Sequence, residues 1–131
     1  MIQVESQLKI VDNSGGKWAK CILVGKKGKT PVATVGMLIL VVLKKISNQK
    51  KVKKRTKYIG LIVGVNFWLK RLDGTFVRFF SNYLLLFNKQ FKFLGTRIYG
   101  SILKEIKITN LKDKKNKKYF IRIFSYCSSI I

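Results

Sequence analysis

The sequence has few acidic residues and no histidine. Its 131 residues include 5 Asp and Glu against 28 Lys and Arg, which gives a formal net charge of +23. General acid–base catalysis, nucleophilic triads and hydrolytic metal sites need His or converging carboxylates. The sequence therefore predicts a protein that is not an enzyme and that has no catalytic residues.

Cysteines and long hydrophobic runs are also scarce. Cys21 and Cys127 lie far apart without the spacing of a metal site, so we expect two small core residues and no metal or other cofactor. The longest uncharged apolar run, residues 35–43, is too short to cross a bilayer as a helix and is typical of a buried strand. The first residues lack the pattern of a secretory or transit peptide. We expect no membrane insertion and a protein that works in the compartment where it is made.

Hydrophobic residues, in contrast, make up 47% of the chain, which is enough for a folded core. A chain of this length fits one domain that needs no metal or disulfide for stability. The positive charge must then lie on a folded surface, where like charges repel each other unless a polyanion neutralises them. The composition therefore favours a protein that binds nucleic acid.

In several segments the hydrophobic residues follow the short period of β-strands. Turn formers and charges separate these segments, and Asp73-Gly74 is a strong signal for a hairpin that aims Arg71 and Arg78 outward from its strands. Because closure removes exposed edges, this pattern predicts a mainly β fold, a small five-stranded closed β-barrel. The expected strands are residues 8–11, 18–24, 36–46, 58–68, 75–80 and 83–87.

The pattern changes towards the C-terminus. Apolar residues between Ile102 and Ile106 have helical spacing, and Ser101 is a candidate N-cap, so a short helix is expected there. The apolar segment 119–124 fits a strand or a helix, and we expect it to pack on the barrel. The chain is thus divided into a β-barrel domain, residues 1–100, and a C-terminal helix and basic extension, residues 101–131.

Three segments together indicate a family. They are VDNSG at residues 11–15, GLIV at 60–63 with Asp73-Gly74 downstream, and GTRIYG at 95–100. In order and spacing they resemble the universal large-subunit ribosomal protein family numbered fourteen, and the resemblance covers about residues 1–108. Each segment alone is a weak signal, whereas the combination is specific.

The resemblance implies a structural constituent of the large ribosomal subunit whose barrel binds rRNA and contributes to the subunit interface in translation. It further implies contacts with neighbouring large-subunit proteins, with small-subunit rRNA through an intersubunit bridge, and with a ribosome silencing factor. Lys far exceeds Arg, and Ile, Asn, Phe and Tyr are plentiful, as in products of AT-rich genes. We therefore expect an organelle-encoded member on a mitochondrial matrix ribosome, with a plastid or bacterial cytoplasmic ribosome as alternatives.

The sequence also departs from the family pattern. Residues 64–67, Gly-Val-Asn-Phe, stand where the family usually has a basic block, and we expect Lys70 and Arg71 to supply the missing charge. The segment 109–119 is longer and more basic than usual, so family contacts of the C-terminus are not carried over to it.

The strongest electrostatic candidate is the basic run between the third and fourth expected strands. No acidic residue interrupts it, which favours phosphate binding over a merely solvated loop. Asn13 and Ser14 lie in a turn and are interpreted either as structural or as contacts to phosphate or 2′-hydroxyl groups. Lys side chains suit phosphates generally, and the planar Arg side chains suit more defined contacts. The predicted RNA-binding residues are Asn13, Ser14, Lys44, Lys45, Lys50, Lys51, Lys53, Lys54, Arg55, Lys70, Arg71, Arg78 and Arg97.

Two rival functions remain at this stage. A free-standing barrel that binds single-stranded nucleic acid non-specifically requires a solvent-facing row of aromatic residues. A cationic protein on anionic membranes requires a strongly amphipathic basic helix, for which 101–108 is a poor fit. Tyr99 could stack on a base or lie half-buried. The other aromatics are expected in the core and at its rim, namely Phe76, Phe79, Phe80, Phe87, Phe91 and Phe93.

Overall fold

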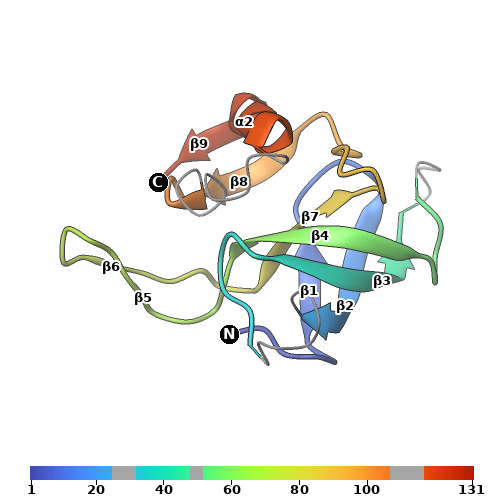
Figure 1. Cartoon of the computed structure of the whole chain (residues 1–131), viewed down its shortest axis with the longest axis horizontal. Helices are drawn as coiled ribbons and strands as arrows, with labels where there is room; N and C mark the ends of the chain where they lie inside the picture. The colour runs from blue at the N-terminus through green and yellow to red at the C-terminus, as the bar shows by residue number, and fades with distance from the viewer. Residues whose placement is uncertain (25–31, 48–51, 107–116) are drawn as a thin grey trace.

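The computed structural model describes residues 1–24, 32–47, 52–106 and 117–131. Five strands form a closed barrel in the order β1-β2-β3-β4-β7 (Figure 1). All neighbouring pairs are antiparallel except β1 and β7, which run parallel and close the barrel. The predicted five-stranded closed barrel is confirmed. Its strands are β1 (Gln7–Ile10), β2 (Gly16–Val24), β3 (Leu38–Ile46), β4 (Lys57–Gly64) and β7 (Tyr83–Phe87).

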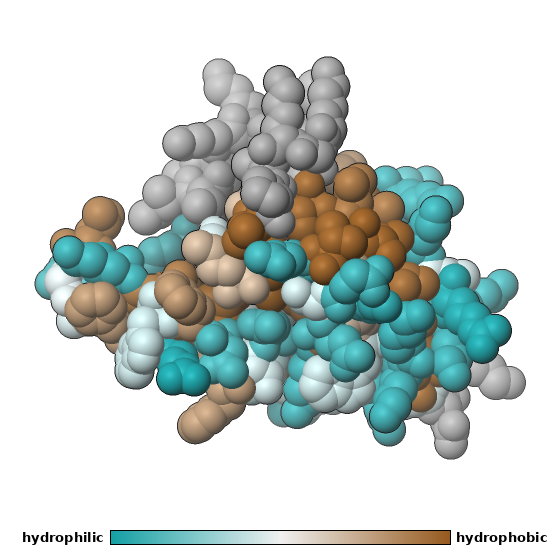
Figure 2. All heavy atoms as spheres, turned by 90° about the horizontal axis from the view of Figure 1, so that it is seen from below, coloured by the Kyte–Doolittle hydropathy of each residue, from teal (hydrophilic) through white to brown (hydrophobic). Residues whose placement is uncertain are grey.

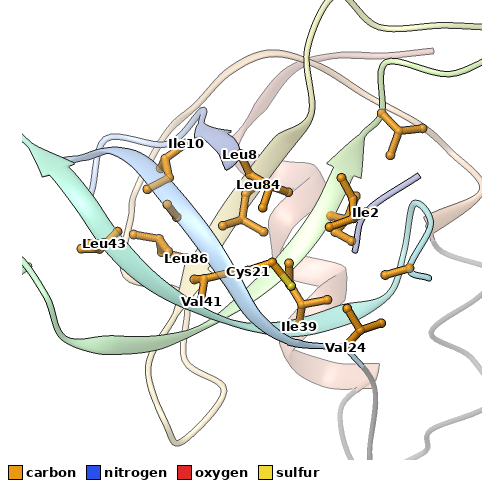
Figure 3. Packing of buried hydrophobic residues seen from close by; sticks show 14 of the residues in the cluster. Ile2, Leu8, Ile10, Cys21, Val24, Ile39, Val41, Leu43, Leu84 and Leu86 are labelled. Atoms are coloured by element: carbon orange, nitrogen blue, oxygen red, sulfur yellow. The ribbon is translucent and has the colours of Figure 1, made fainter. Parts of the chain in front are cut away.

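Alternation along the strands fills the barrel. In β1, Leu8 and Ile10 are buried while Lys9 between them is exposed. The inward side chains of several strands point toward one another inside the barrel (Figure 3), and Cys21 is among them as predicted. A Cβ at Gly60 would lie 2.5 Å from a methyl carbon of Leu84, so a larger residue there would force the buried Leu84 side chain to move.

A second apolar cluster covers the outer face of β4 and β7. Leu61, Val63 and Leu85 pack there against Ile98 and Ile123. Because these strands are covered on both faces, β4 from Gly60 onward and most of β7 lack the alternation seen in β1. The covering elements are the parallel pair β8 (Ile98–Ile102) and β9 (Cys127–Ile130), together with helix α2 (Lys117–Tyr126) (Figure 1).

The C-terminal expectations need correction. A helix capped by Ser101 is wrong, because Ser101 lies in β8 and its hydroxyl bonds that of Ser129 in β9. Helical conformation begins only at Ile106, after a turn. The ambiguous segment 119–124 is helical within α2, and Cys127 is half-buried rather than part of the core. The boundary expected at residue 100 falls inside β8, and the division into two parts stays a prediction.

A two-stranded hairpin of β5 (Leu69–Lys70) and β6 (Phe76–Val77) projects from the barrel (Figure 1). The Asp73-Gly74 turn is confirmed: Thr75 donates from N and Oγ1 to Asp73 Oδ1 at 3.0 and 2.6 Å, and Gly74 has φ +87°. These bonds, that of the Thr75 hydroxyl first, hold the pKa of the Asp73 carboxyl below its ordinary value.

Two expected strands are too long. The strand predicted over 58–68 ends at Gly64, and the one predicted over 75–80 is reduced to β6. The cause is local: the amide of Asn66 donates to the Asn82 side chain at 2.9 Å rather than to a neighbouring strand. The chain therefore leaves the barrel after Gly64 and begins the hairpin.

Candidate nucleic-acid interface

An ordered basic turn leads into β4. Lys53, Lys54 and Arg55 are all exposed in it. The amide of Arg55 donates to the carbonyl of Leu43 at 3.1 Å, and the amide of Lys53 donates to the Tyr58 hydroxyl at 3.1 Å. The backbone is thus bonded to the barrel while the cationic side chains face solvent.

Lys44 and Lys45 extend this surface along β3, where both are exposed. We call Lys44, Lys45, Lys53, Lys54 and Arg55 the basic end. Within the described ranges, ion pairs join only Lys20 to Glu5 and Arg71 to Glu105. No described carboxylate therefore pairs with the basic end.

Two predicted contacts, Lys50 and Lys51, lie outside the described residues. The structure places the other members of the basic run, Lys53, Lys54 and Arg55, on one turn. Lys57, at the start of β4, is exposed as well.

The turn at residues 12–14 is structural. Ser14 is fully buried, and its hydroxyl and its amide both donate to Asp12 Oδ1. Asp12 Oδ2 accepts from the amide of Leu86 at 2.9 Å. Burial raises the pKa of the Asp12 carboxyl despite these hydrogen bonds, which oppose the shift. Ser14 has no exposed surface in this structure, which favours the structural interpretation of the turn, and its contact with RNA stays a prediction.

Asn13 positions Arg97. Its Oδ1 accepts from the amides of Thr96 and Arg97 at 2.7 and 3.1 Å, and its Nδ2 donates to Thr96 Oγ1 at 2.9 Å. The Arg97 guanidinium carbon lies 5.6 Å from the ring centre of Tyr99, and both side chains are exposed. The first and last of the three sequence motifs therefore meet and present one cation beside one aromatic ring.

Arg71 and Arg78 have different roles. Arg71 is largely buried, lies 3.0 Å from Glu105 as an ion pair, and donates from Nη2 to the carbonyl oxygen of Ile131 at 2.6 Å. It therefore fixes the base of the hairpin, and its expected contact with RNA stays a prediction. Lys70 and Arg78 are exposed.

Residues 64–67 hold Arg78 in place. Asn66 Oδ1 accepts from Arg78 Nε at 2.9 Å. The Arg78 guanidinium carbon also lies 5.9 Å from the ring centre of Trp68. Thus Asn66 and Trp68 together orient the side chain of Arg78, the residue that follows β6.

Sequence reasoning missed several exposed residues. Strand alternation marks Lys9 as outward-facing, since Leu8 and Ile10 flank it. Phe76 and Phe80 were expected in the core or at its rim, but they are 59% and 96% exposed. The missed exposed cations are Lys9, Lys17, Lys89, Lys92, Lys104 and Arg122.

Comparison with known proteins shows the family of the chain. The whole chain, residues 1–131, matches the family Ribosomal protein L14p/L23e. The chain belongs to this family. It is also similar to the large ribosomal subunit protein uL14 of Carsonella ruddii (strain PV), at 37% identity over 131 residues and 100% of both chains.

Membership of the L14p/L23e family makes the chain a structural ribosomal protein and not an enzyme. In the described part of the chain, no three His, Cys, Asp or Glu side chains gather where they could hold a metal ion. None of the helices described is both long enough and apolar enough to span a membrane.

Proposed function

We propose that this L14p/L23e protein is a structural constituent of the large ribosomal subunit that binds rRNA with several separate faces. The observation that carries the proposal is the spread of exposed cations over the basic end, the Arg97 loop and the hairpin, none of which pairs with a carboxylate of the described residues. Figure 2 displays one face, on which hydrophilic residues lie beside and below a central hydrophobic patch. A rigid barrel with cations on several sides lowers the repulsion between rRNA segments that it separates.

The finer parts of the proposal follow from the family. Residues 1–100 form the rRNA-binding unit, and residues 101–131 form an extension on it. The partners are neighbouring large-subunit proteins, small-subunit rRNA through an intersubunit bridge, and a ribosome silencing factor. Amino-acid usage supports a mitochondrial ribosome, and the relative from Carsonella ruddii supports a bacterial one equally well. Fractionation of organelles before ribosome isolation distinguishes the two.

A second candidate function has one observation in its favour. Among the described residues, six aromatic side chains are exposed, which a single-strand binder would use for stacking. Five of them lie on the hairpin, beside it or on β8, one lies in α2, and none lies on a strand of the barrel. They are Phe67, Trp68, Phe76, Phe80, Tyr99 and Tyr126.

Sedimentation of native lysate at low and high salt tests the proposal against this alternative. A ribosomal constituent migrates with the large subunit and stays there through a high-salt wash. Recovery at the top of the gradient would favour the free single-strand binder.

Charge reversal tests the basic end. Lys53→Glu, Lys54→Glu and Arg55→Glu together should make the negative slope of log affinity against log salt shallower by about 2 units, because about three phosphate contacts are lost. Titration of the full chain with rRNA fragments at several salt concentrations measures this slope. The charge-conserving set Lys53→Arg, Lys54→Arg and Arg55→Lys serves as the control and should keep the original slope. An unchanged slope in the reversed variant would remove this turn from the interface.

A further inference from the structure

A groove lies between β1, the end of the hairpin and β8. It encloses about 530 Å³, within the size range of ligand sites. Lys9 and Arg78 contribute cations to its lining, while Phe80 and Tyr99 contribute aromatic rings. No acidic residue is among the described residues that line it.

The inner wall of the groove is fixed. The rings of Phe79 and Tyr83 meet edge to face with centres 5.9 Å apart. A Cβ at Gly64 would lie 2.9 Å from Phe79 Cγ and 3.0 Å from a ring carbon of Tyr83, so glycine allows these rings to pack against the barrel. The aromatic pair is therefore part of the folded structure and not a flexible lining.

The outer wall exposes flat apolar surface. Phe80 is 96% exposed and Tyr99 is 54% exposed, and the Arg97 guanidinium lies against the Tyr99 ring. The bond to Asn66 uses one of the five N–H donors of Arg78. Aromatic rings that stack on bases, placed beside cations that bind phosphates, are the combination with which proteins hold unpaired nucleotides.

Resting on the proposed rRNA function, we propose that this aromatic groove holds an unpaired nucleotide of the rRNA. Phe80 and Tyr99 contact the base, and Lys9 and Arg78 contact its phosphates. The charge of the lining and the net charge of +23 favour a nucleic acid over an apolar peptide as the occupant.

A second hollow supports a path for the strand. It encloses about 430 Å³ and shares Lys9 and Tyr99 with the aromatic groove. Lys17 and Trp18 also line it, together with the largely buried Asp12. A nucleotide that follows the bound one would cross Tyr99 and enter this second hollow.

The test compares two RNA probes of equal charge. One is a single-stranded uridine hexamer, and the other has the same phosphates but lacks the two central bases. The full chain should bind the complete hexamer about tenfold more tightly, since stacking contributes about 1–3 kcal/mol per base. Phe80→Ser and Tyr99→Ser should each reduce this preference, whereas Leu72→Ser, an exposed apolar change on the hairpin, should keep it. Fluorescence anisotropy measures the affinities, and thermal melting verifies that each variant is folded.

The outcomes separate this inference from the proposed function. Equal affinity for both probes would overturn the aromatic groove and leave phosphate binding by the exposed cations intact. If Phe80→Ser and Tyr99→Ser both keep the preference for the complete hexamer, the bases stack elsewhere, and this result would also overturn the proposed role of the aromatic groove. Failure to bind either probe would contradict both proposals. Charge reversal of the basic end should lower the affinity for both probes by the same factor.

Discussion

At the scale of single residues, Asp12 connects the most parts of the fold. Its two carboxylate oxygens accept from Ser14 and from the Leu86 amide, so it ties the turn after β1 to β7. The residue is buried, and the cost of removing its charge from water exceeds the gain from these bonds, which is why its pKa is raised. Asp12, one of the few acidic residues of the chain, therefore has a structural role within the motif at residues 11–15.

We predict that Asp12→Asn lowers the free energy of unfolding by about 1–3 kcal/mol, because an amide NH₂ cannot accept the bond from Leu86. A raised pKa in the folded state means that the contribution of Asp12 is greatest below its ordinary pKa and falls as pH rises through the raised value. The difference in the free energy of unfolding between wild type and Asp12→Asn should therefore become smaller from acidic to neutral pH. Urea denaturation across this pH range measures this difference.

The matched control is Asp73→Asn. Bonds from Thr75 lower the pKa of Asp73, so its stabilising contribution is present above its ordinary pKa and is lost on acidification. The difference in the free energy of unfolding between wild type and Asp73→Asn should therefore become larger as pH rises. Identical pH trends for the two variants would contradict the assignment for Asp12.

At the scale of elements, the β5–β6 hairpin owes its direction to contacts at its base. Leu72 at its turn is fully exposed, so the hairpin has little apolar burial of its own there. Arg71 instead reaches Glu105 and the carbonyl oxygen of Ile131. The C-terminal elements thus orient a hairpin that precedes them in the chain.

We predict that Glu105→Gln lowers stability by about 1–3 kcal/mol, because it leaves a largely buried guanidinium without its charged partner. Hydrogen exchange should also become faster for residues 69–77. Glu5→Gln breaks the exposed pair with Lys20 and should change stability by less than about 1 kcal/mol. Equal effects of the two substitutions would show that Arg71 does not anchor the hairpin.

At the scale of the whole molecule, charge opposes folding while the apolar clusters favour it. A net charge of +23 on a small domain produces repulsion that salt or RNA screens. We predict that the melting temperature of the free chain rises with NaCl concentration. The charge-reversed basic end, with three cations replaced by anions, should be less sensitive to salt. A melting temperature that does not depend on salt would mean that repulsion is unimportant in the free protein.

Sequence reasoning predicted the barrel because its signals are local. Alternation in β1 and the Asp73-Gly74 turn follow from residues close together in the chain. It failed for β8 and β9, whose pairing joins Ser101 to Ser129 across 28 positions through short strands without a clear period. A strand partner so far along the chain leaves no trace in a hydrophobic pattern.

For the interface, sequence indicated which side chains carry charge but not which of them the fold already uses. The exposed residues of the basic end agree with their prediction as surface cations. Arg71 bonds to Glu105 and Ile131, which both lie far from it in the sequence. Ser14 bonds to the nearby Asp12. Phe80 was expected in the core or at its rim and is exposed instead. The sequence does not show which aromatic rings the apolar cluster on the outer face of β4 and β7 can accommodate.

The parallel pairing of β1 with β7 also determines when the barrel can close during synthesis. Lys9 and Ile10 pair with Tyr83 and Leu84, so the first strand has no closing partner until most of the chain has been made. Asn13 finds Thr96 later still. A nascent chain with this topology keeps its first strand open until β7 has been made, so closure of the barrel is a non-local step that the early strands cannot complete by themselves.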